Sequence, residues 1–233
     1  MHRHKFKMKV LFFGRHECDA SKKILSLIQK EGFDVTYIQS KTRGEKIPEY
    51  AYEWEGDYII CFRTLYILPD ALLTKARIAA INFHPAPPEY PGSGCINFAL
   101  YDEVDTYGVT AHLMNKEIDN GKILEVRRFP VNKHDNLTIV LKRTHQELHK
   151  LCSDFISKLA SEGDRFVMSK LAEYKDVNWV GKARLMRELN ELQTIDVDIE
   201  KSELERIIRS TYIDGFPPKI KIHGYEFYLN LDD

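Results

Sequence analysis

Asn82, His84 and Asp119 are the residues whose types and spacing could do chemistry together. Asn82 and His84 end an apolar run and lead into a loop, Pro85–Gly94, that holds four prolines and two glycines. Asp119 precedes an Asn-Gly pair that favours a turn. A carboxylate near a histidine orients the ring and raises its pKa, and an amide supplies a neutral donor. Together the three side chains could polarise a carbonyl, stabilise the oxyanion that it becomes and move a proton.

Strand and helix patterns alternate around this loop. Short apolar runs indicate strands, whereas apolar residues three and four positions apart indicate helices. Strands separated by helices need crossover connections, which favour an α/β fold: a Rossmann-like, mainly parallel sheet with helices on both faces. The predicted strands are Val10–Phe13, Val35–Ile38, Asp57–Phe62, Ala79–Phe83, Tyr107–Met114 and Ile123–Phe129, and the predicted helices are Ala20–Lys30, Leu68–Ala76, Ile96–Leu100 and one long helix from Asn136 to Leu159.

The position of Asn82 and His84 in this sheet favours a site. In an open parallel sheet, ligands bind beyond the carboxyl ends of the strands. Asn82 and His84 lie at such an end, on either side of Phe83. We expect the strand to break at His84, because Pro85 cannot continue the pairing and restricts the residue before it. With that break, both side chains would face one cleft.

The last quarter of the chain has a different character. Polar turns at residues 161–165 and 175–182 separate a predicted catalytic domain (residues 1–165) from a small C-terminal α+β segment (residues 178–233). The segment has two helical stretches, residues 183–192 and 202–210. It ends in a β-hairpin, Lys219–Leu229, around a two-residue His-Gly turn. An isolated hairpin is marginal in water, and this one has apolar side chains on both strands. We expect it to pair with its copy in a homodimer.

Composition argues against several classes of partner. The 34 lysines and arginines are balanced by 35 acidic residues, so no surplus of positive charge favours nucleic acid. The first apolar run, Val10–Phe13, is too short for a signal sequence or a membrane span, whether the chain starts at Met1 or at Met8. The four cysteines are scattered, which argues against zinc and favours reduced thiols in a cytoplasm. We therefore expect a cytoplasmic protein with neither a nucleic-acid nor a membrane partner.

Two motifs carry a resemblance to a known family. The N-x-H-P of Asn82 and His84, the proline-rich loop and the later D-x-G-x-I of Asp119 resemble the formyltransferases that use N10-formyltetrahydrofolate. The resemblance extends over roughly residues 8–155. It implies that Asn82 and His84 stabilise the tetrahedral oxyanion, that Asp119 tunes His84 and relays the proton, and that no metal is required.

A further stretch, FRTLYILPDALL, begins at Phe62 and is similar to the loop that lines the pterin pocket in this family. The resemblance therefore implies that Tyr66, Ile67 and Leu68 contact the folate, together with Asp119.

The stretch NFHPAPPEYPGSGCINFALYDE, from Asn82, looks most like the branch of the family that formylates the amine of nucleotide-linked amino sugars. The implied substrate is a dTDP-4-amino-4,6-dideoxyhexose, with the glucose epimer favoured, for cell-surface polysaccharide synthesis. Glycinamide ribonucleotide enzymes carry a Gly/Ser-rich loop after the first strand, where this chain has GRHECDAS with one glycine. Methionyl-tRNA enzymes are longer and more basic, and a hydrolase typically has a regulatory domain. A non-catalytic folate- or nucleotide-binding module is the alternative from another class.

Residues for holding the nucleotide sugar are less clearly indicated. A diphosphate needs cations or helix N-termini, and Arg15 and Arg63 end two strands at the same edge. Tyr90 and Gly92, in the proline loop, either face the sugar or pack within the loop. Trp179 either stacks on a base or, as the favoured interpretation, fills the core between the two domains. The histidines of the long helix, at positions 145 and 149, are interpreted as a solvated flank.

Overall fold

The computed structural model describes residues 7–231, and within them two β-sheets form. The larger sheet has the strand order β2-β1-β3-β4-β5-β6. Its first four strands are parallel, whereas β5 is antiparallel to both of its neighbours. The predicted α/β class and mainly parallel sheet are therefore confirmed. The strands are β1 (Lys9–Arg15), β2 (Asp34–Ser40), β3 (Gly56–Phe62), β4 (Ala76–His84), β5 (Thr106–Leu113) and β6 (Ile123–Pro130).

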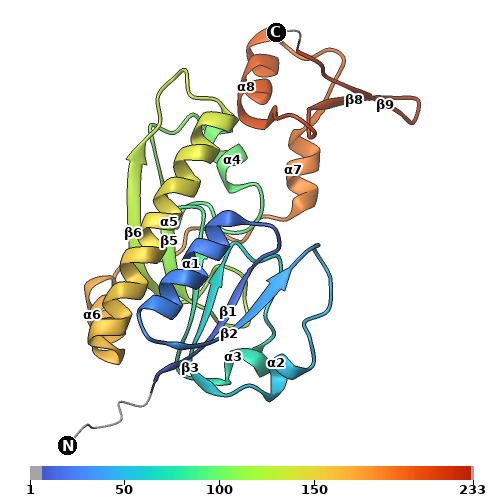
Figure 1. Ribbon diagram of the computed structural model, residues 1–233. Coiled ribbons are helices and arrows are strands. Elements are labelled where there is room, and N and C mark those ends of the chain that lie inside the picture. The colour runs from blue at the N-terminus through green and yellow to red at the C-terminus, as the bar shows by residue number, and fades with distance from the viewer. Residues whose placement is uncertain (1–6, 232–233) are drawn as a thin grey trace, which may run out of the picture.

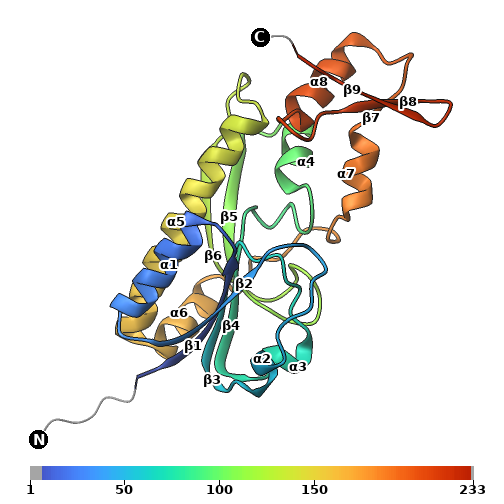
Figure 2. The same ribbon diagram turned by 45° about the vertical axis from the view of Figure 1, so that its right-hand side comes forward.

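Helices cover both faces of this sheet, as predicted (Figures 1 and 2). One face packs against α1 (Asp19–Lys30), α5 (Leu137–Glu162) and α6 (Asp164–Glu173) around a core that includes Phe12 and Phe155. The other face is covered by two short helices, α2 (Tyr50–Glu53) and α3 (Asp70–Leu73), and by the loops next to them. This second face is therefore the more thinly covered of the two.

The long helix α5 follows from its sequence. The Asn136 side chain accepts a hydrogen bond from the Ile139 N–H at 3.0 Å and caps the first turn. A stripe of side chains three and four residues apart is buried against the sheet, as predicted. After Gly163 the chain enters α6, whose Phe166 and Val167 join the core of the same sheet. The domain boundary proposed at residue 165 thus falls inside a helix that packs on the larger sheet.

The C-terminal segment is a separate small layer. It contains α7 (Met186–Leu192), α8 (Lys201–Thr211) and a sheet of β7 (Thr194–Ile195), β8 (Lys219–Ile222) and β9 (Tyr225–Tyr228). Both residues of the predicted His-Gly turn have positive φ angles, 48° at His223 and 86° at Gly224, which a two-residue hairpin turn requires.

Helix α8 attaches this segment to α4 (Cys95–Tyr101). The Arg209 guanidinium donates to the carbonyls of Leu100 and Asp135, at 3.1 and 3.0 Å, and Arg206 lies over the Tyr101 ring. The hairpin projects beyond this contact, away from the larger sheet (Figure 2). No helix within residues 7–231 is long and apolar enough to cross a membrane.

Candidate active site

Strand β4 carries Asn82 and His84 to the centre of the candidate site. It pairs through His84, with Asn82 opposite His112 and His84 opposite Thr110 on β5. The predicted break at His84 is therefore wrong, and it is not needed. Because side chains alternate along a strand, residues two apart lie on the same face. Asn82 and His84 share a face for that reason alone.

Asp119 meets His84 although 35 positions separate them in the sequence. Its Oδ2 lies 3.2 Å from Nδ1 of His84, and the two side chains are 7% and 5% exposed. The segment that carries Asp119 runs very close to β5, since a Cβ on Gly121 would collide with the Leu113 carbonyl. Asp119 itself has a φ of 46°, in the left-handed region that aspartate tolerates better than most residues. The sequence motif thus encodes a tight loop as well as a carboxylate.

A fourth polar side chain, His112, belongs to the cluster and was missed by the sequence analysis. Its Nδ1 donates to the Leu113 carbonyl at 2.8 Å, and its Nε2 lies 3.1 Å from the Asn82 amide nitrogen. Nε2 is also 3.4 Å from Oδ1 of Asp119. The available signal was a lone histidine on an otherwise apolar strand. Pairing of β5 with β4 turns it into a neighbour of Asn82.

Electrostatics keep Asp119 ionised. Burial raises its pKa, but His84, His112 and the Gly92 N–H outweigh burial and lower the pKa to about 2. The Gly92 N–H donates to Oδ2 at 2.9 Å. Asp119 is therefore an anion throughout the neutral range, shared between two imidazole rings.

His84 behaves differently from the expectation. Burial lowers its pKa, and this effect exceeds the opposing influence of Asp119 and of the Tyr90 carbonyl. The ring is thus neutral at pH 7, and the predicted rise in its pKa is wrong in net direction. Nε2 is 3.1 Å from the Tyr90 carbonyl, while Nδ1 faces Asp119. A neutral ring donates from only one nitrogen, so either Asp119 or the Tyr90 carbonyl receives no hydrogen bond from the ring until a second proton binds. This arrangement suits a group that takes up a proton during a reaction.

The proline loop holds these side chains in place. Tyr90 supplies the carbonyl to His84, and its hydroxyl donates to Asp102 at 3.0 Å. Gly92 has a φ of 88°, and a Cβ there would collide with the backbone of Arg184. Only glycine fits that position. Tyr90 and Gly92, predicted to face a sugar or to pack within the loop, contact His84 and Asp119 through their backbone atoms.

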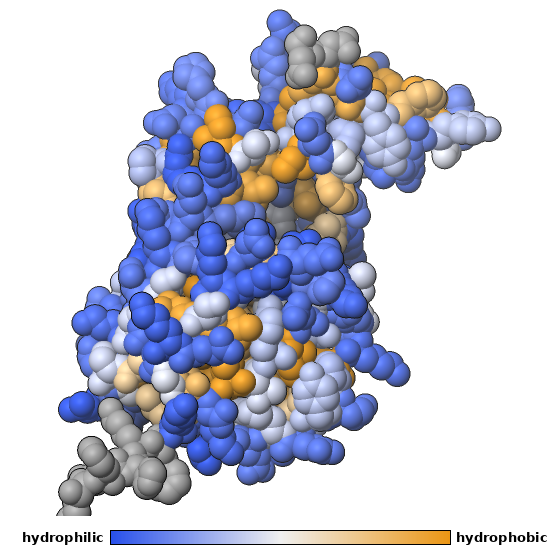
Figure 3. Space-filling view, viewed as in Figure 1, coloured by the Kyte–Doolittle hydropathy of each residue, from blue (hydrophilic) through white to orange (hydrophobic). Residues whose placement is uncertain are grey.

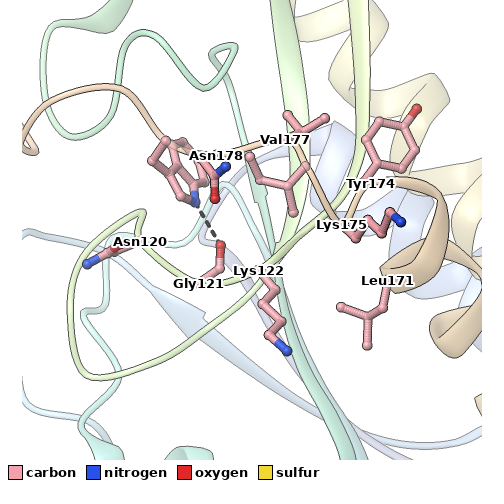
Figure 4. Close-up of a pocket in the computed structure, with 10 residues that line it drawn as sticks. Asn120, Gly121, Lys122, Leu171, Tyr174, Lys175, Val177 and Asn178 are labelled. Carbon is pink, nitrogen blue, oxygen red and sulfur yellow. Dashed lines mark hydrogen bonds between the residues drawn. The ribbon is translucent and has the colours of Figure 1, made fainter.

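Trp179 covers the cluster from the segment that follows α6. Its indole N–H donates to the Gly121 carbonyl at 2.7 Å (Figure 4). The indole meets His112 and His84 edge-on, with ring centroids 4.9 and 5.6 Å away. Beyond it lies a pocket of about 340 Å³, lined by residues 120–123 and by the end of α6 and the segment after it (Figure 4). Trp179 therefore packs on His84 and His112, a position that neither sequence interpretation specified.

The loop predicted to bind folate descends along the thinly covered face of the sheet. Leu68 is buried in the core of that face, and Tyr66 packs against the same core. The Tyr66 hydroxyl donates to the Gln39 carbonyl at 3.2 Å. Ile67, between them, is 73% exposed. Of the three predicted residues, Ile67 has the side chain that is free to contact a ligand.

Arg15 and Arg63 lie at the carboxyl ends of two neighbouring parallel strands. Arg15 is the last residue of β1, and Arg63 follows β3, whose pairing with β1 ends at Phe13 and Cys61. Neither arginine forms an ion pair among the residues described. Figure 3 shows a hollow in the surface between the larger sheet and the C-terminal segment. Within residues 7–231, no three or more histidine, cysteine, aspartate or glutamate side chains are grouped so that they could hold a metal ion.

Comparisons with known proteins agree with this arrangement. A model of the formyl transferase family matches residues 8–156. The GDP-perosamine N-formyltransferase of Brucella melitensis is 23% identical over 198 residues, which cover 84% of this chain and 73% of that protein.

Two solved structures share the fold over nearly the whole chain. A sugar N-formyltransferase from a Shewanella species has a TM-score of 0.74 at 19% identity, with 96% of this chain and 97% of the other covered. The N-formyltransferase of Helicobacter canadensis, crystallised with folinic acid and dTDP-3-aminofucose, has a TM-score of 0.68 at 16% identity, with 95% and 86% covered. Because the family model matches more than half of its residues, this chain belongs to the formyl transferase family of enzymes.

Proposed function

We propose that the enzyme transfers the formyl group of N10-formyltetrahydrofolate to the amine of a nucleotide-linked amino sugar. The observation that carries the proposal is the buried cluster in which Asn82 and His84 share one strand face and Asp119 contacts the His84 ring. The sugar N-formyltransferases with similar sequence or fold support the acceptor class.

The chemistry follows from the protonation states. The neutral sugar amine attacks the formyl carbon, a C–N bond forms, and the carbonyl oxygen becomes an oxyanion. The Asn82 amide donates to that oxygen, and one pre-organised donor of this kind lowers the barrier by about 3 kcal/mol. Neutral His84 accepts the proton that the amine loses, and ionised Asp119 stabilises the imidazolium. The bond from carbon to N10 then breaks, and the proton passes to N10. The substrate must displace the Tyr90 carbonyl from Nε2, because both ring nitrogens face protein acceptors.

The folate is proposed to lie along the thinly covered face, between the exposed Ile67 side chain and the segment that leads to Asp119. Chemistry at such a site needs no metal, because the formyl group is already activated on N10. For the acceptor we favour dTDP-4-amino-4,6-dideoxyglucose, used in cell-surface polysaccharide synthesis. We place the reaction in the cytoplasm, in keeping with four unpaired cysteines.

The test is a screen of amine acceptors with N10-formyltetrahydrofolate. It includes dTDP- and GDP-linked 3-amino and 4-amino sugars, glycinamide ribonucleotide and methionyl-tRNA, with products identified by a mass gain of one CO. We expect a nucleotide sugar to be formylated. A product from glycinamide ribonucleotide or methionyl-tRNA alone would overturn the acceptor class, and folate binding without any turnover would favour a binding module.

We also propose that the terminal hairpin pairs with a second copy of this chain. β9 is the edge strand of its small sheet. Phe227 and its neighbours expose an apolar surface that has no cover within the described chain; the residues are Phe216, Ile222, Tyr225, Phe227 and Tyr228, exposed by 74%, 41%, 72%, 57% and 59%. Because an edge strand is self-complementary about a two-fold axis, a copy of the same surface is the partner that fits it.

A further inference from the structure

A segment outside the residues that match the family model closes over the candidate site. Residues 177–184, which we call the strap, follow α6 and run along the proline loop. The Val180 N–H donates to the Pro88 carbonyl at 2.9 Å, and the Arg184 N–H donates to the Pro91 carbonyl at 3.0 Å. Backbone hydrogen bonds therefore fix the strap on the loop that holds the cluster.

The Trp179 indole, carried by the strap, lies between two different environments. Its ring contacts His112 and His84 edge-on, with centroids 4.9 and 5.6 Å away. It also lines the pocket of about 340 Å³, in which the Lys122 side chain is exposed to solvent (Figure 4). The hydrogen bond from its N–H to the Gly121 carbonyl, 2.7 Å long, fixes the orientation of the ring. The indole is therefore a wall between the two imidazoles and the solvent of that pocket.

Water that entered the cluster would compete with the amine acceptor. Neutral His84, proposed to accept the proton of the amine, can accept one from water as well. In that reaction the water oxygen bonds to the formyl carbon and the bond from carbon to N10 breaks. One water proton passes to N10, and the other leaves with formic acid, which ionises to formate. Active sites prevent side reactions of this kind by excluding water.

We propose that Trp179 excludes water from His84 and His112 and so restricts formyl transfer to the amine acceptor. Its action is on the two imidazoles rather than on the reacting atoms, which makes it a positioning residue. The donor, N10-formyltetrahydrofolate, rests on the proposed function, whereas the cover over the histidines rests on the contacts of Trp179. The lowered pKa of His84 agrees with this cover, because burial is its largest cause.

Three variants test the wall. Trp179→Ala removes the ring, whereas Trp179→Phe keeps an aromatic cover without the indole N–H. Trp54→Ala is the matched control, because Trp54 is the other tryptophan of the chain and packs beside Gly56 at the amino end of β3, away from the site. Circular dichroism and thermal melting compare the fold of each variant with that of the wild type.

The first measurement is the access of a reagent to the histidines in the free protein, without folate or acceptor. Diethyl pyrocarbonate modifies accessible neutral imidazoles, and mass spectrometry of peptides reports each histidine separately. We expect His84 and His112 to react in Trp179→Ala and to be protected in the wild type and the other two variants. The exposed His134 should react in all four proteins. Equal protection of both histidines in Trp179→Ala and the wild type would overturn the wall.

The second measurement is formate release from N10-formyltetrahydrofolate without an acceptor. We expect Trp179→Ala to release formate about tenfold faster than the wild type, and Trp179→Phe and Trp54→Ala to match the wild type. With an acceptor present, the ratio of formate released to amine formylated should rise in Trp179→Ala alone. A merely structural role would lower both reactions together and leave this ratio unchanged, and that result would overturn the proposal.

These outcomes separate the inference from the proposed function. If a nucleotide sugar is formylated but the ratio is the same in Trp179→Ala and the wild type, the role of Trp179 is refuted and the function stands. If no amino sugar is formylated while Trp179→Ala exposes His84 and releases formate faster, the acceptor class fails and the exclusion of water stands. Formate release by none of the four proteins would overturn the role of Trp179 in the reaction.

Discussion

The catalytic cluster and the terminal hairpin are opposite departures from ordinary packing. The cluster buries a carboxylate and two imidazoles, whereas the hairpin exposes Phe227 and Tyr225 by 57% and 72%. Buried polar groups and exposed apolar groups are each costly, so each needs a compensating interaction. In the cluster that interaction is internal, since Asp119 and the two imidazole rings contact one another, Asn82 and the Gly92 N–H. For the hairpin we propose that it comes from a second copy of the chain. The comparison therefore contrasts a proposed catalytic site with a proposed assembly surface.

The largest expected effect is on turnover. Asn82→Ala and His84→Ala should each lower kcat by about 10²-fold to 10³-fold, because each removes a group proposed to act on the transition state. Stopped-flow or mass-spectrometric assays of formyl transfer would measure this loss. His134→Ala, at an exposed position outside the site, is the control for His84→Ala and should keep wild-type kcat. Circular dichroism establishes that the variants fold. Near-wild-type activity in His84→Asn would contradict the assigned role of the ring.

The contacts that stabilise the Asp119 anion should make the stability of the fold sensitive to acid. Its pKa is about 2 in the folded chain and 3.8 in a free carboxyl. A lowered carboxyl pKa stabilises the fold above the unfolded pKa, and that stability is lost as the pH falls from about 4 to about 2. The loss is about 2 kcal/mol, measurable by urea unfolding. Asp119→Asn should lack this part of the pH dependence. An identical acid profile in the variant would show that Asp119 is not held by the cluster.

His84 should add to this acid sensitivity, at a higher pH than Asp119. Because its folded pKa is lowered, the unfolded chain takes up this proton first, so the fold loses stability as the pH falls below about 6.5. Asp119→Asn should lower the pKa of His84 further, which NMR of the ring would report. An unchanged His84 pKa in that variant would contradict the coupling.

An intermediate effect is expected at Ile67. Its side chain is exposed like those of the hairpin, but the partner proposed for it is the folate and not a second copy of the chain. Ile67→Ser removes one apolar contact of roughly 1.5 kcal/mol, so KM for N10-formyltetrahydrofolate should rise about tenfold with kcat unchanged. Thermal stability should stay within the error of the wild type. If KM is unaffected, the folate does not contact this loop at Ile67.

The smallest effect on chemistry is expected at the hairpin. Phe227→Glu should convert a dimer into a monomer in light scattering while kcat per chain stays unchanged. The melting temperature of the wild type should rise with protein concentration, and that of the variant should not. Asn190→Glu, at an exposed position of α7 outside the hairpin, tests whether added charge alone has this effect. A wild-type chain that is monomeric at micromolar concentration would refute the assembly.

Much of the architecture follows from local pattern. The strand Lys9–Arg15, the capped helix from Asn136 and the His-Gly turn were predictable because short-range periodicity, capping and turn preferences act within a few residues. Asn82, His84 and Asp119 were identified as a group, and the structure brings them together. The antiparallel placement of β5 was not predictable, because strand order depends on contacts between segments distant in the sequence.

The sequence alone determined which side chains were available for chemistry and at which strand end they lie. It also determined the family, through motifs that are contiguous. Only the tertiary structure decided that His112 joins Asn82 and that Trp179 covers both His84 and His112. It also decided the sign of the His84 pKa shift, since burial outweighs the neighbouring carboxylate. The physical reason is the same in each case: pairing between strands and desolvation are set by residues far apart along the chain.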